Sequence, residues 1–357
     1  MTRILSPLTT GSTTLAETFT PFTSGVPMVV LSPSITRSGA VSSSLVPAGR
    51  RSTRRVSFSS TRYCFPPTRM TAFFILFLKL TLTLTILSYL TVKCKSARII
   101  LMANVICVTN QKGGVGKTTT AVNLAYFLAK AKNRVLIIDF DPQGNATSGL
   151  GVEKRDLSST MTEVMLGQVP LSSVIVGTRT KNLDIAPTTP QLANTEVELA
   201  KEKAQKFIRL RAAINSVADN YDYVIIDSPP SLSLLTVNGM VAAEYLLLPV
   251  QTEFYALEGV AQLLESMQLV KKAMNPSLKL LGVLATMYDK RTSLSVQVLE
   301  EVKKYFKDKV FETTIPRNVR VAEAPSHGVP VGSYDKFSKG AKAYKSLAKE
   351  VMERTKK

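Results

Sequence analysis

From residue 102 onward, short apolar runs typical of buried strands alternate with longer segments that carry a helical pattern of apolar residues. The pattern predicts strands at 104–109, 134–139, 182–186, 223–227, 244–250, 279–286 and 310–314. It predicts helices between them, including 118–131, 257–274, 294–306 and 340–354. Because strands that alternate with helices form mostly parallel sheets, we expect a doubly wound α/β domain over residues 102–357, with helices on both faces of the sheet.

Residues 1–101 do not belong to this pattern. They are rich in Ser and Thr, and they carry 12 Lys and Arg with Glu17 as the only acid. Of the chain's net charge of +19 they hold +11, which leaves +8 for the remaining 256 residues. We expect no packed core in residues 1–101. The moderate positive charge of the remainder permits a nucleic-acid partner without requiring one.

An apolar run at 71–92, interrupted by Lys79, has the length of a membrane span, which takes about 20 residues. The central lysine would cost roughly 2.5 to 3.5 kcal/mol on insertion. Three interpretations stay open for residues 1–101: sequence upstream of a true start at Met102, an organellar transit peptide, or a membrane anchor. We favour the start at Met102, because the unpatterned composition ends sharply there, directly before the first predicted strand.

The most informative segment is 110–120, Asn-Gln-Lys-Gly-Gly-Val-Gly-Lys-Thr-Thr-Thr, which follows one predicted strand and opens a helix. This context is typical of a phosphate-binding loop. Its glycines allow φ > 0, so that successive N–H groups can point at phosphate oxygens, and the helix N-terminus adds further donors. Lys117 would meet the β- and γ-phosphates, and Thr118 would ligate Mg²⁺. The predicted nucleotide-binding residues are Lys112, Gly113, Gly114, Val115, Gly116, Lys117, Thr118 and Thr119.

Carboxylates follow two of the predicted strands. Asp139 ends one strand, Asp141 comes two residues later, and Asp227 ends another strand. Right-handed crossovers in an open α/β sheet bring the carboxyl ends of the strands to one edge, where ligands bind. We therefore expect these carboxylates beside Lys117.

The loop departs from the ordinary phosphate-binding pattern, because it has Gln111 where glycine is usual and adds Lys112. With this second lysine it resembles the deviant Walker A motif of the ParA/MinD family of ATPases. Segments similar to the ParA (Soj) branch of that family are 135–145, 223–231, 286–289, 315–320 and 323–326. The resemblance covers residues 102–357 nearly end to end and implies the fold of the P-loop NTPases.

The resemblance implies an ATP hydrolase that uses ATP and Mg²⁺. It implies that Thr118, Asp139 and Asp227 organise the metal, and that Asp141 orients the attacking water. It also implies that Lys112 crosses to the nucleotide of a second subunit, so that ATP holds together a transient homodimer. The expected catalytic residues are Lys112, Lys117 and Asp141.

In function, the chain resembles chromosome- or plasmid-partitioning ATPases. The resemblance implies an ATP-bound dimer that binds double-stranded DNA without sequence preference and is released when a ParB-type centromere-binding protein stimulates hydrolysis. Such a protein would lie in the cytoplasm on the nucleoid. A location at a membrane or in an organelle would be expected only if residues 1–101 are a genuine part of the protein. The resemblance places Arg291, Arg317 and Arg320 on a DNA-contacting surface, and Pro316 and Asn318 near the adenine.

The main alternative is a MinD-like membrane-cycling ATPase that positions division machinery or other protein cargo. It would need a C-terminal amphipathic helix with bulky apolar residues. The predicted helix 340–354 has only a narrow stripe of Tyr344, Leu347 and Val351, so we expect no membrane contact for the core. A third alternative is a module that binds nucleotide without turning it over. The single histidine, His327, excludes a zinc site built on histidines.

Overall fold

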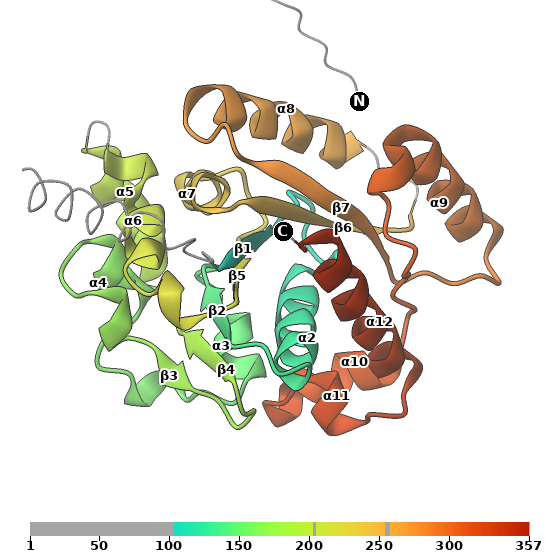
Figure 1. Cartoon of the computed structure of the whole chain (residues 1–357), viewed down its shortest axis with the longest axis horizontal. Helices are drawn as coiled ribbons and strands as arrows, with labels where there is room; N and C mark the ends of the chain where they lie inside the picture. The colour runs from blue at the N-terminus through green and yellow to red at the C-terminus, as the bar shows by residue number, and fades with distance from the viewer. Residues whose placement is uncertain (1–102, 203–204, 254–257, 357) are drawn as a thin grey trace, which may run out of the picture. The chain divides into compact units, whose positions relative to one another are not determined.

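The computed structural model describes residues 103–202, 205–253 and 258–356 (Figure 1). The predictions for residues 1–101, including the apolar run at 71–92 and the start at Met102, lie outside these residues. In the part of the chain that is described, no helix is both long enough and apolar enough to cross a membrane.

Seven strands of the described residues form one sheet in the order β3-β4-β2-β5-β1-β6-β7. Neighbouring strands run parallel, except that β3 pairs antiparallel with β4 at one edge. The mostly parallel α/β fold is confirmed. The strands are β1 Asn104–Val108, β2 Val135–Asp139, β3 Val176–Gly177, β4 Leu183–Ala186, β5 Tyr223–Asp227, β6 Tyr245–Gln251 and β7 Lys279–Thr286.

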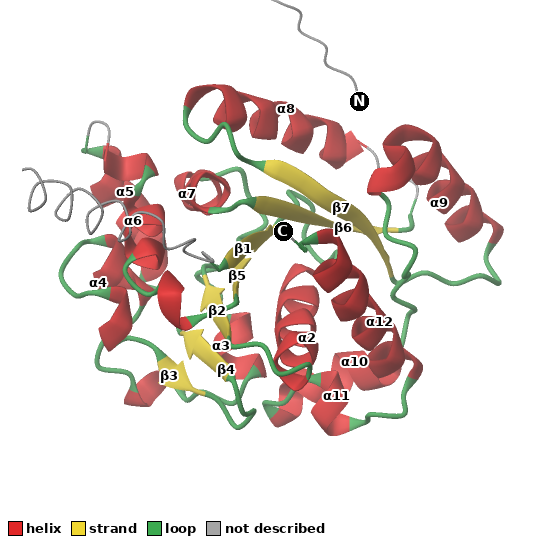
Figure 2. Cartoon of the chain, in the orientation of Figure 1, coloured by secondary structure: helices red, strands yellow, loops and turns green. Residues whose placement is uncertain are grey.

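Helices cover both faces of the sheet (Figure 2). In β1, Ile106 and Val108 pack on one face in a core with α2 Lys117–Lys130 and α12 Lys339–Arg354. Cys107 packs on the other face in a core with α7 Leu234–Ala242 and α8 Glu258–Ala273. Strands covered on both faces read as continuous apolar runs, which is why the central strands were visible in the sequence.

The remaining elements are shorter, apart from α9. The α-helices are α3 Asn145–Gly149, α4 Met161–Met165, α5 Leu192–Ala200, α6 Arg209–Asn215, α9 Ser293–Phe306, α10 Val319–Glu323 and α11 Val331–Tyr334. The 3₁₀ helices are η1 Lys154–Asp156, η2 Leu171–Ser173, η3 Gln205–Phe207, η4 Ala218–Asn220, η5 Lys307–Lys309 and η6 Ala324–His327.

The predicted strand at 310–314 is wrong. Val310 forms only an isolated bridge with Val283 of β7. The N–H groups of Glu312 and Thr313 donate instead to the Glu350 carboxylate of α12, at 2.9 and 3.2 Å. Phe311 and Ile315 still donate to the Val283 and Ala285 carbonyls of β7, both at 2.9 Å, but the residues between them are bonded to Glu350, so no continuous ladder forms. The other six predicted strands, and the four predicted helices, agree with β1, β2, β4 to β7, α2, α8, α9 and α12 to within one residue at each end.

The C-terminal helix α12 packs against α2. Its apolar stripe of Tyr344, Leu347 and Val351 is buried, and the Tyr344 hydroxyl lies 3.4 Å from the Thr120 hydroxyl of α2. The stripe that a membrane-binding helix would have to expose is therefore covered by the helix that follows the phosphate-binding loop.

Candidate functional site

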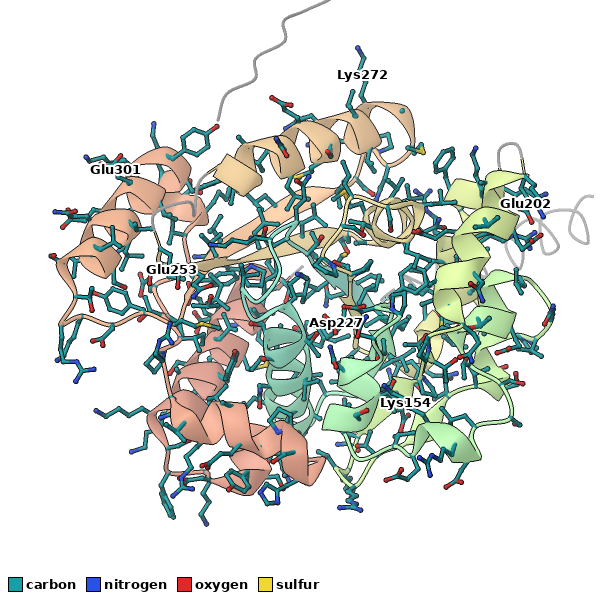
Figure 3. All side chains as sticks on the ribbon, turned by 180° about the vertical axis from the view of Figure 1, so that it is seen from behind. Lys154, Glu202, Asp227, Glu253, Lys272 and Glu301 are labelled. Atoms are coloured by element: carbon teal, nitrogen blue, oxygen red, sulfur yellow. The ribbon has the colours of Figure 1, made fainter. Side chains whose placement is uncertain are left out.

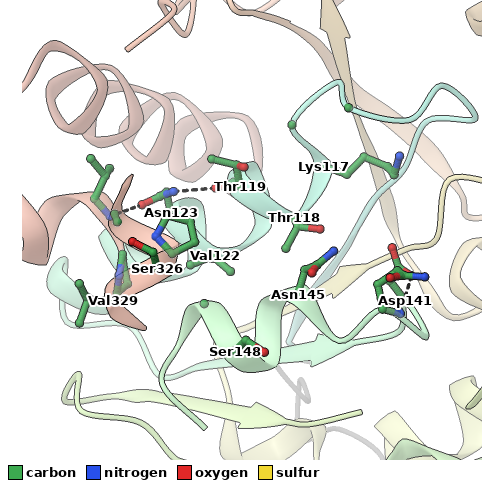
Figure 4. A pocket seen from close by; sticks show the side chains of 18 of the residues that line it. Lys117, Thr118, Thr119, Val122, Asn123, Asp141, Asn145, Ser148, Ser326 and Val329 are labelled. Carbon is green, nitrogen blue, oxygen red and sulfur yellow. Dashed lines mark hydrogen bonds between the residues drawn. The ribbon is translucent and has the colours of Figure 1, made fainter. Parts of the chain in front are cut away.

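A cavity of about 620 Å³ lies where the loops after β1 and β2 meet a loop from the C-terminal part of the chain. Figure 4 shows Lys117, Thr118 and Asp141 on one side of it, with Ser326 and Val329 on the other. Predicted site residues that line it are Gly113, Gly114, Gly116, Lys117, Thr118, Thr119 and Asp141. The position fits the rule that ligands bind at the carboxyl ends of parallel strands.

The glycine-rich loop is held in shape by hydrogen bonds from buried neighbours. Gly114 and Gly116 have φ of 75° and 85°, in the left-handed region that favours glycine, whereas Gly113 does not. The Thr286 hydroxyl at the end of β7 donates to the Val115 carbonyl at 2.8 Å. Val115 itself is buried and does not line the cavity. Helix α2 begins without a side-chain cap, so its first N–H groups remain available to an anion.

Lys117 places a nearly buried ammonium at the cavity, since the residue is only 6% exposed. Its Nζ donates to the Lys112 carbonyl at 3.1 Å. Burial lowers its pKa, and the nearby carboxylates of Asp227 and Asp141 oppose that shift. An ammonium with one protein acceptor retains donors that phosphate oxygens can take.

Asp139 and Asp227 lie side by side, because β2 and β5 pair in register at their last residues. Both are fully buried, and Figure 3 shows Asp227 deep among the strands. Burial raises the pKa of each carboxyl. At Asp139, the two hydrogen bonds from Thr147 partly offset this rise in pKa. At Asp227, the negative charge of Asp139 raises the pKa further. Two neighbouring buried carboxylates resist ionising together unless a cation lies between them.

The oxygens of this pair fit Mg²⁺. Asp139 Oδ1 and both oxygens of Asp227 are buried without a hydrogen bond of ordinary geometry, although the Thr118 hydroxyl is close enough to lower the Asp227 pKa. The described residues contain no group of three or more His, Cys, Asp or Glu that could hold a metal by itself. Mg²⁺ commonly takes one or two carboxylates and completes its shell with water and substrate phosphates. The site therefore suits a metal that arrives with a nucleotide.

Asp141 differs from the strand-end pair in facing the cavity. It is 6% exposed, and its Oδ1 accepts the N–H of Gln143 at 3.0 Å. A fixed carboxylate beside the phosphate loop is placed to orient a water molecule or to accept its proton.

Lys112 and the adenine-site candidates lie elsewhere. The Nζ of Lys112 is 3.5 Å from Glu253, whose carboxylate is also 3.9 Å from Arg317. Pro316 pairs with Tyr288 in an isolated bridge, and Asn318 caps α10 by accepting the N–H of Val321 at 3.3 Å. None of Lys112, Pro316 and Asn318 is among the residues that line the cavity.

The three predicted DNA-contacting arginines are exposed, and each lies near a carboxylate. Arg291 makes a two-pronged contact with Asp289 at 2.7 and 3.0 Å, which lowers the Asp289 pKa to about 2. Arg320 lies 2.9 Å from Glu323. The bridge between Tyr288 and Pro316 brings the turn that carries Arg291 beside the segment that carries Arg317 and Arg320. Exposed pairs of this kind contribute little to stability, so the arginines can exchange partners.

Several cavity residues were not singled out from the sequence. Asn123 of α2 donates to the Thr119 carbonyl and accepts the N–H of Val331, both at 2.8 Å, and so joins the phosphate loop to the C-terminal wall. The wall includes Ala324, Pro325 and Ser326, part of a segment noticed only for its resemblance. Gln143, Asn145, Pro230 and Met287 likewise lie in segments noted only for their resemblance. The others are Val122, Ser148, Gly149, Val329, Pro330 and Val331.

Comparison with known proteins identifies the family. Residues 103–280 match the AAA_31 family, an AAA domain. Over 250 residues the chain is 53% identical to the sporulation initiation inhibitor protein Soj of Bacillus subtilis, covering 70% of this chain and 98% of Soj. It is 49% identical to the chromosome partitioning protein ParA of Myxococcus xanthus, covering 71% of this chain and 89% of that protein. The chain belongs to the ParA/Soj family of chromosome-partitioning ATPases.

Solved structures agree with this placement. The ParA/Soj ATPase resembles cobyrinic acid a,c-diamide synthase from Mycobacterium smegmatis with bound ADP and magnesium, at a TM-score of 0.61 and 38% identity, covering 70% of this chain and 93% of that one. It also resembles septum site-determining protein MinD from Pyrococcus horikoshii complexed with Mg-ADP. The TM-score is 0.59 and the sequence identity is 28%, and the match covers 70% of this chain and 96% of that one. Membership of this family makes the chain an ATP hydrolase, and both of these neighbours hold ADP together with magnesium.

Thr147 is a testable support of the strand-end pair in this ParA/Soj ATPase. Its N–H and hydroxyl donate to Asp139 Oδ2 at 2.7 and 2.6 Å, and its oxygen accepts the N–H of Thr188 at 3.1 Å. We propose that these bonds aim Asp139 at Mg²⁺. Thr147→Val should then weaken Mg²⁺ binding to the ADP-loaded protein about 10- to 100-fold, measured by Mg²⁺ titration.

Thr147→Ser should restore most of that affinity, because it keeps the hydroxyl. Thr195→Val is the matched control, since Thr195 is equally buried but donates to the Leu192 carbonyl of α5. Equal Mg²⁺ affinity in the wild type and Thr147→Val would contradict the role.

Proposed function

We propose that this ATPase partitions DNA as an ATP-bound homodimer that binds duplex DNA without sequence preference. A ParB-type partner then stimulates hydrolysis, and the dimer dissociates from DNA. The observation that carries the proposal is the 53% identity to Soj over 98% of that protein's length, together with the match to proteins named for chromosome partitioning. The P-loop fold alone would not suffice, because it supports many activities.

The position of Lys112 supports the dimer. Its side chain is 36% exposed, lies outside the cavity of its own subunit and is paired with Glu253, whereas Lys117 already supplies an ammonium to that cavity. We propose that Lys112 leaves Glu253 when a second subunit presents its nucleotide. A half-exposed ion pair is a small barrier, of the order of 1 kcal/mol or less, so a desolvated phosphate can displace the carboxylate.

The arginines support the DNA surface. Arg291, Arg317 and Arg320 are gathered at the carboxyl end of β7, and their side chains are 85%, 68% and 53% exposed. Phosphate groups could replace the carboxylates that they now contact. Binding through phosphates is insensitive to sequence and releases counterions, which makes it sensitive to salt.

The test is duplex-DNA binding by the full chain, measured by fluorescence anisotropy with ATP or ADP over a salt series. We expect binding only with ATP, falling by about 0.9 log units per decade of salt for each phosphate contact. A double variant, Arg291→Ala with Arg320→Ala, should bind more weakly and lower this slope by about one unit for each of the two arginines that meets a phosphate.

Arg155→Ala is the matched control, because Arg155 is exposed on η1 and has no ion pair among the described residues. It should bind DNA as the wild type does. Absence of DNA binding by folded protein that still hydrolyses ATP would reject the proposal. ATP-dependent binding to anionic vesicles instead would favour the MinD-like alternative, although α12 has its apolar face packed on α2.

A further inference from the structure

A second cavity, of about 650 Å³, lies at the opposite edge of the sheet from the nucleotide site, where β6 and β7 begin. It shares no lining residue with the first cavity. Its volume is in the range of small-molecule sites, roughly 300 to 1,000 Å³. The residues that line it are Tyr245, Lys271, Lys279, Leu280, Leu281, Asp308, Lys309, Arg354 and Lys356.

Cationic side chains outnumber carboxylates in this basic cavity. Five of its lining residues are cationic and one, Asp308, is a carboxylate, while Glu350 and Glu244 lie beside the lining residues Arg354 and Tyr245. Asp308 pairs with Lys309 at 3.0 Å. Arg354 pairs with Glu350 at 2.8 Å and donates to two backbone carbonyls, so its guanidinium is fixed. None of the ion pairs found among the described residues involves the other three, Lys271, Lys279 and Lys356.

Helix dipoles explain only part of this arrangement. Lys271 and Arg354 lie in the last turns of α8 and α12, and Lys356 lies just beyond α12, where the negative end of a helix favours a cation. Lys279, in contrast, opens a strand, and its Nζ lies 5.9 Å from the ring centroid of Tyr245. Lys272, beside Lys271 in the same turn, points away from the fold in Figure 3 and does not line the cavity. More cationic side chains therefore line the cavity than the helix ends alone would favour.

The floor of the basic cavity is apolar and rigid. Tyr245 and Leu281 are 8% and 5% exposed; Tyr245 begins β6, and Leu281 belongs to β7, the edge strand that pairs parallel with it. A concave surface with a low-dielectric floor and a rim of one charge concentrates field lines and attracts ions of the opposite charge. Lysine ammonium groups bind phosphate as point charges, without the planar match that arginine needs.

We propose that the basic cavity binds a small ligand that carries a chain of phosphate groups, independently of the nucleotide at the first site. Three lysines from three different parts of the chain, Lys271 of α8, Lys279 of β7 and Lys356 after α12, would contact successive phosphates, and fixed Arg354 would hold one wall. The proposal does not depend on the partitioning function.

The test uses the full chain saturated with a fluorescent ADP analogue, in metal-free buffer because the titrant, inorganic tripolyphosphate, chelates Mg²⁺. Calorimetry should record one molecule of tripolyphosphate bound per chain, while the fluorescence shows that the analogue stays bound at the first site. Lys279→Glu with Lys356→Glu should weaken this binding at least about tenfold, because each change replaces attraction by repulsion.

The matched control reverses two exposed lysines outside the cavity, Lys303→Glu with Lys342→Glu, and should leave tripolyphosphate affinity within about twofold. Thermal melting verifies that both variants are folded. No tripolyphosphate binding while ADP is bound, or equal weakening in the two double variants, would overturn the proposal. A parallel titration with duplex DNA separates the two sources of phosphate: if only DNA binding responds to Lys279→Glu with Lys356→Glu, the cavity is a nucleic-acid contact and the small-ligand site is rejected.

Discussion

Replacing Lys117 with alanine should lower the rate of ATP hydrolysis at saturating ATP by a factor of about 10³ or more, judged from the loss of comparable charge-stabilising groups. The reason is the environment of the ammonium. It is 6% exposed, makes one hydrogen bond to the protein and lines the cavity. In a site with little water, charge that develops on the γ-phosphoryl oxygens has few alternative donors. Phosphate release at steady state measures the effect.

The control for this prediction is Lys130→Ala, which removes an exposed lysine from the other end of the same helix. It should leave hydrolysis within about twofold of the wild type. A melting curve separates loss of activity from loss of fold, because Lys117→Ala leaves the Lys112 carbonyl without its donor. If folded Lys117→Ala keeps a tenth or more of the wild-type rate, other groups stabilise the charge on the phosphate.

Asp141→Ala should slow hydrolysis by a factor of about 10² or more and leave nucleotide affinity within a few-fold of the wild type. Asp141 lines the cavity, and Gln143 fixes one of its oxygens at 3.0 Å, so the carboxylate is oriented before water arrives. The side chain carries a negative charge and so adds nothing to phosphate binding. Single-turnover hydrolysis measures the chemical step, and a fluorescent ADP analogue measures affinity.

Asp141→Asn distinguishes two roles for this residue. If Asp141 only holds water in place, the amide should retain much of the rate; if it accepts a proton, the amide should be as slow as alanine. Asp156→Ala is the control, since Asp156 is exposed on η1. If Asp141→Ala hydrolyses ATP as fast as the wild type, another group must orient the attacking water.

The fold was predictable because its signals are local. Strands β2 and β5 are apolar along their whole length, and the sheet buries both of their faces. The edge strand β3 was not predicted, because two residues, one of them Gly177, give no periodicity. The error at 310–314 has the opposite cause. Phe311 is fully buried and apolar, but the next two N–H groups donate to Glu350, distant in sequence, and bonding to β7 resumes only at Ile315.

The site was predictable where chemistry and spacing coincide. Lys117 and Asp141 come after strands, at the edge of the sheet where parallel sheets bind ligands, so the local sequence is enough to predict that they lie at the site. Asn123 and Thr147 are polar residues inside helices, and nothing in their neighbourhood reveals that they contact Val331 and Asp139. The wall at 324–331 depends on packing across about two hundred residues of chain, which a local pattern does not contain.

The packing of α12 on α2 has a consequence for how the chain can be divided. The family match ends at residue 280, yet one wall of the nucleotide cavity is built from residues 324–331, and α12 covers the helix that begins with Lys117. A break at 280 would expose the apolar face of α2 and leave the cavity open on one side. Residues 281–356 are therefore not an appendage to a smaller ATPase module, and recombination or truncation at that boundary would separate two halves of one catalytic unit.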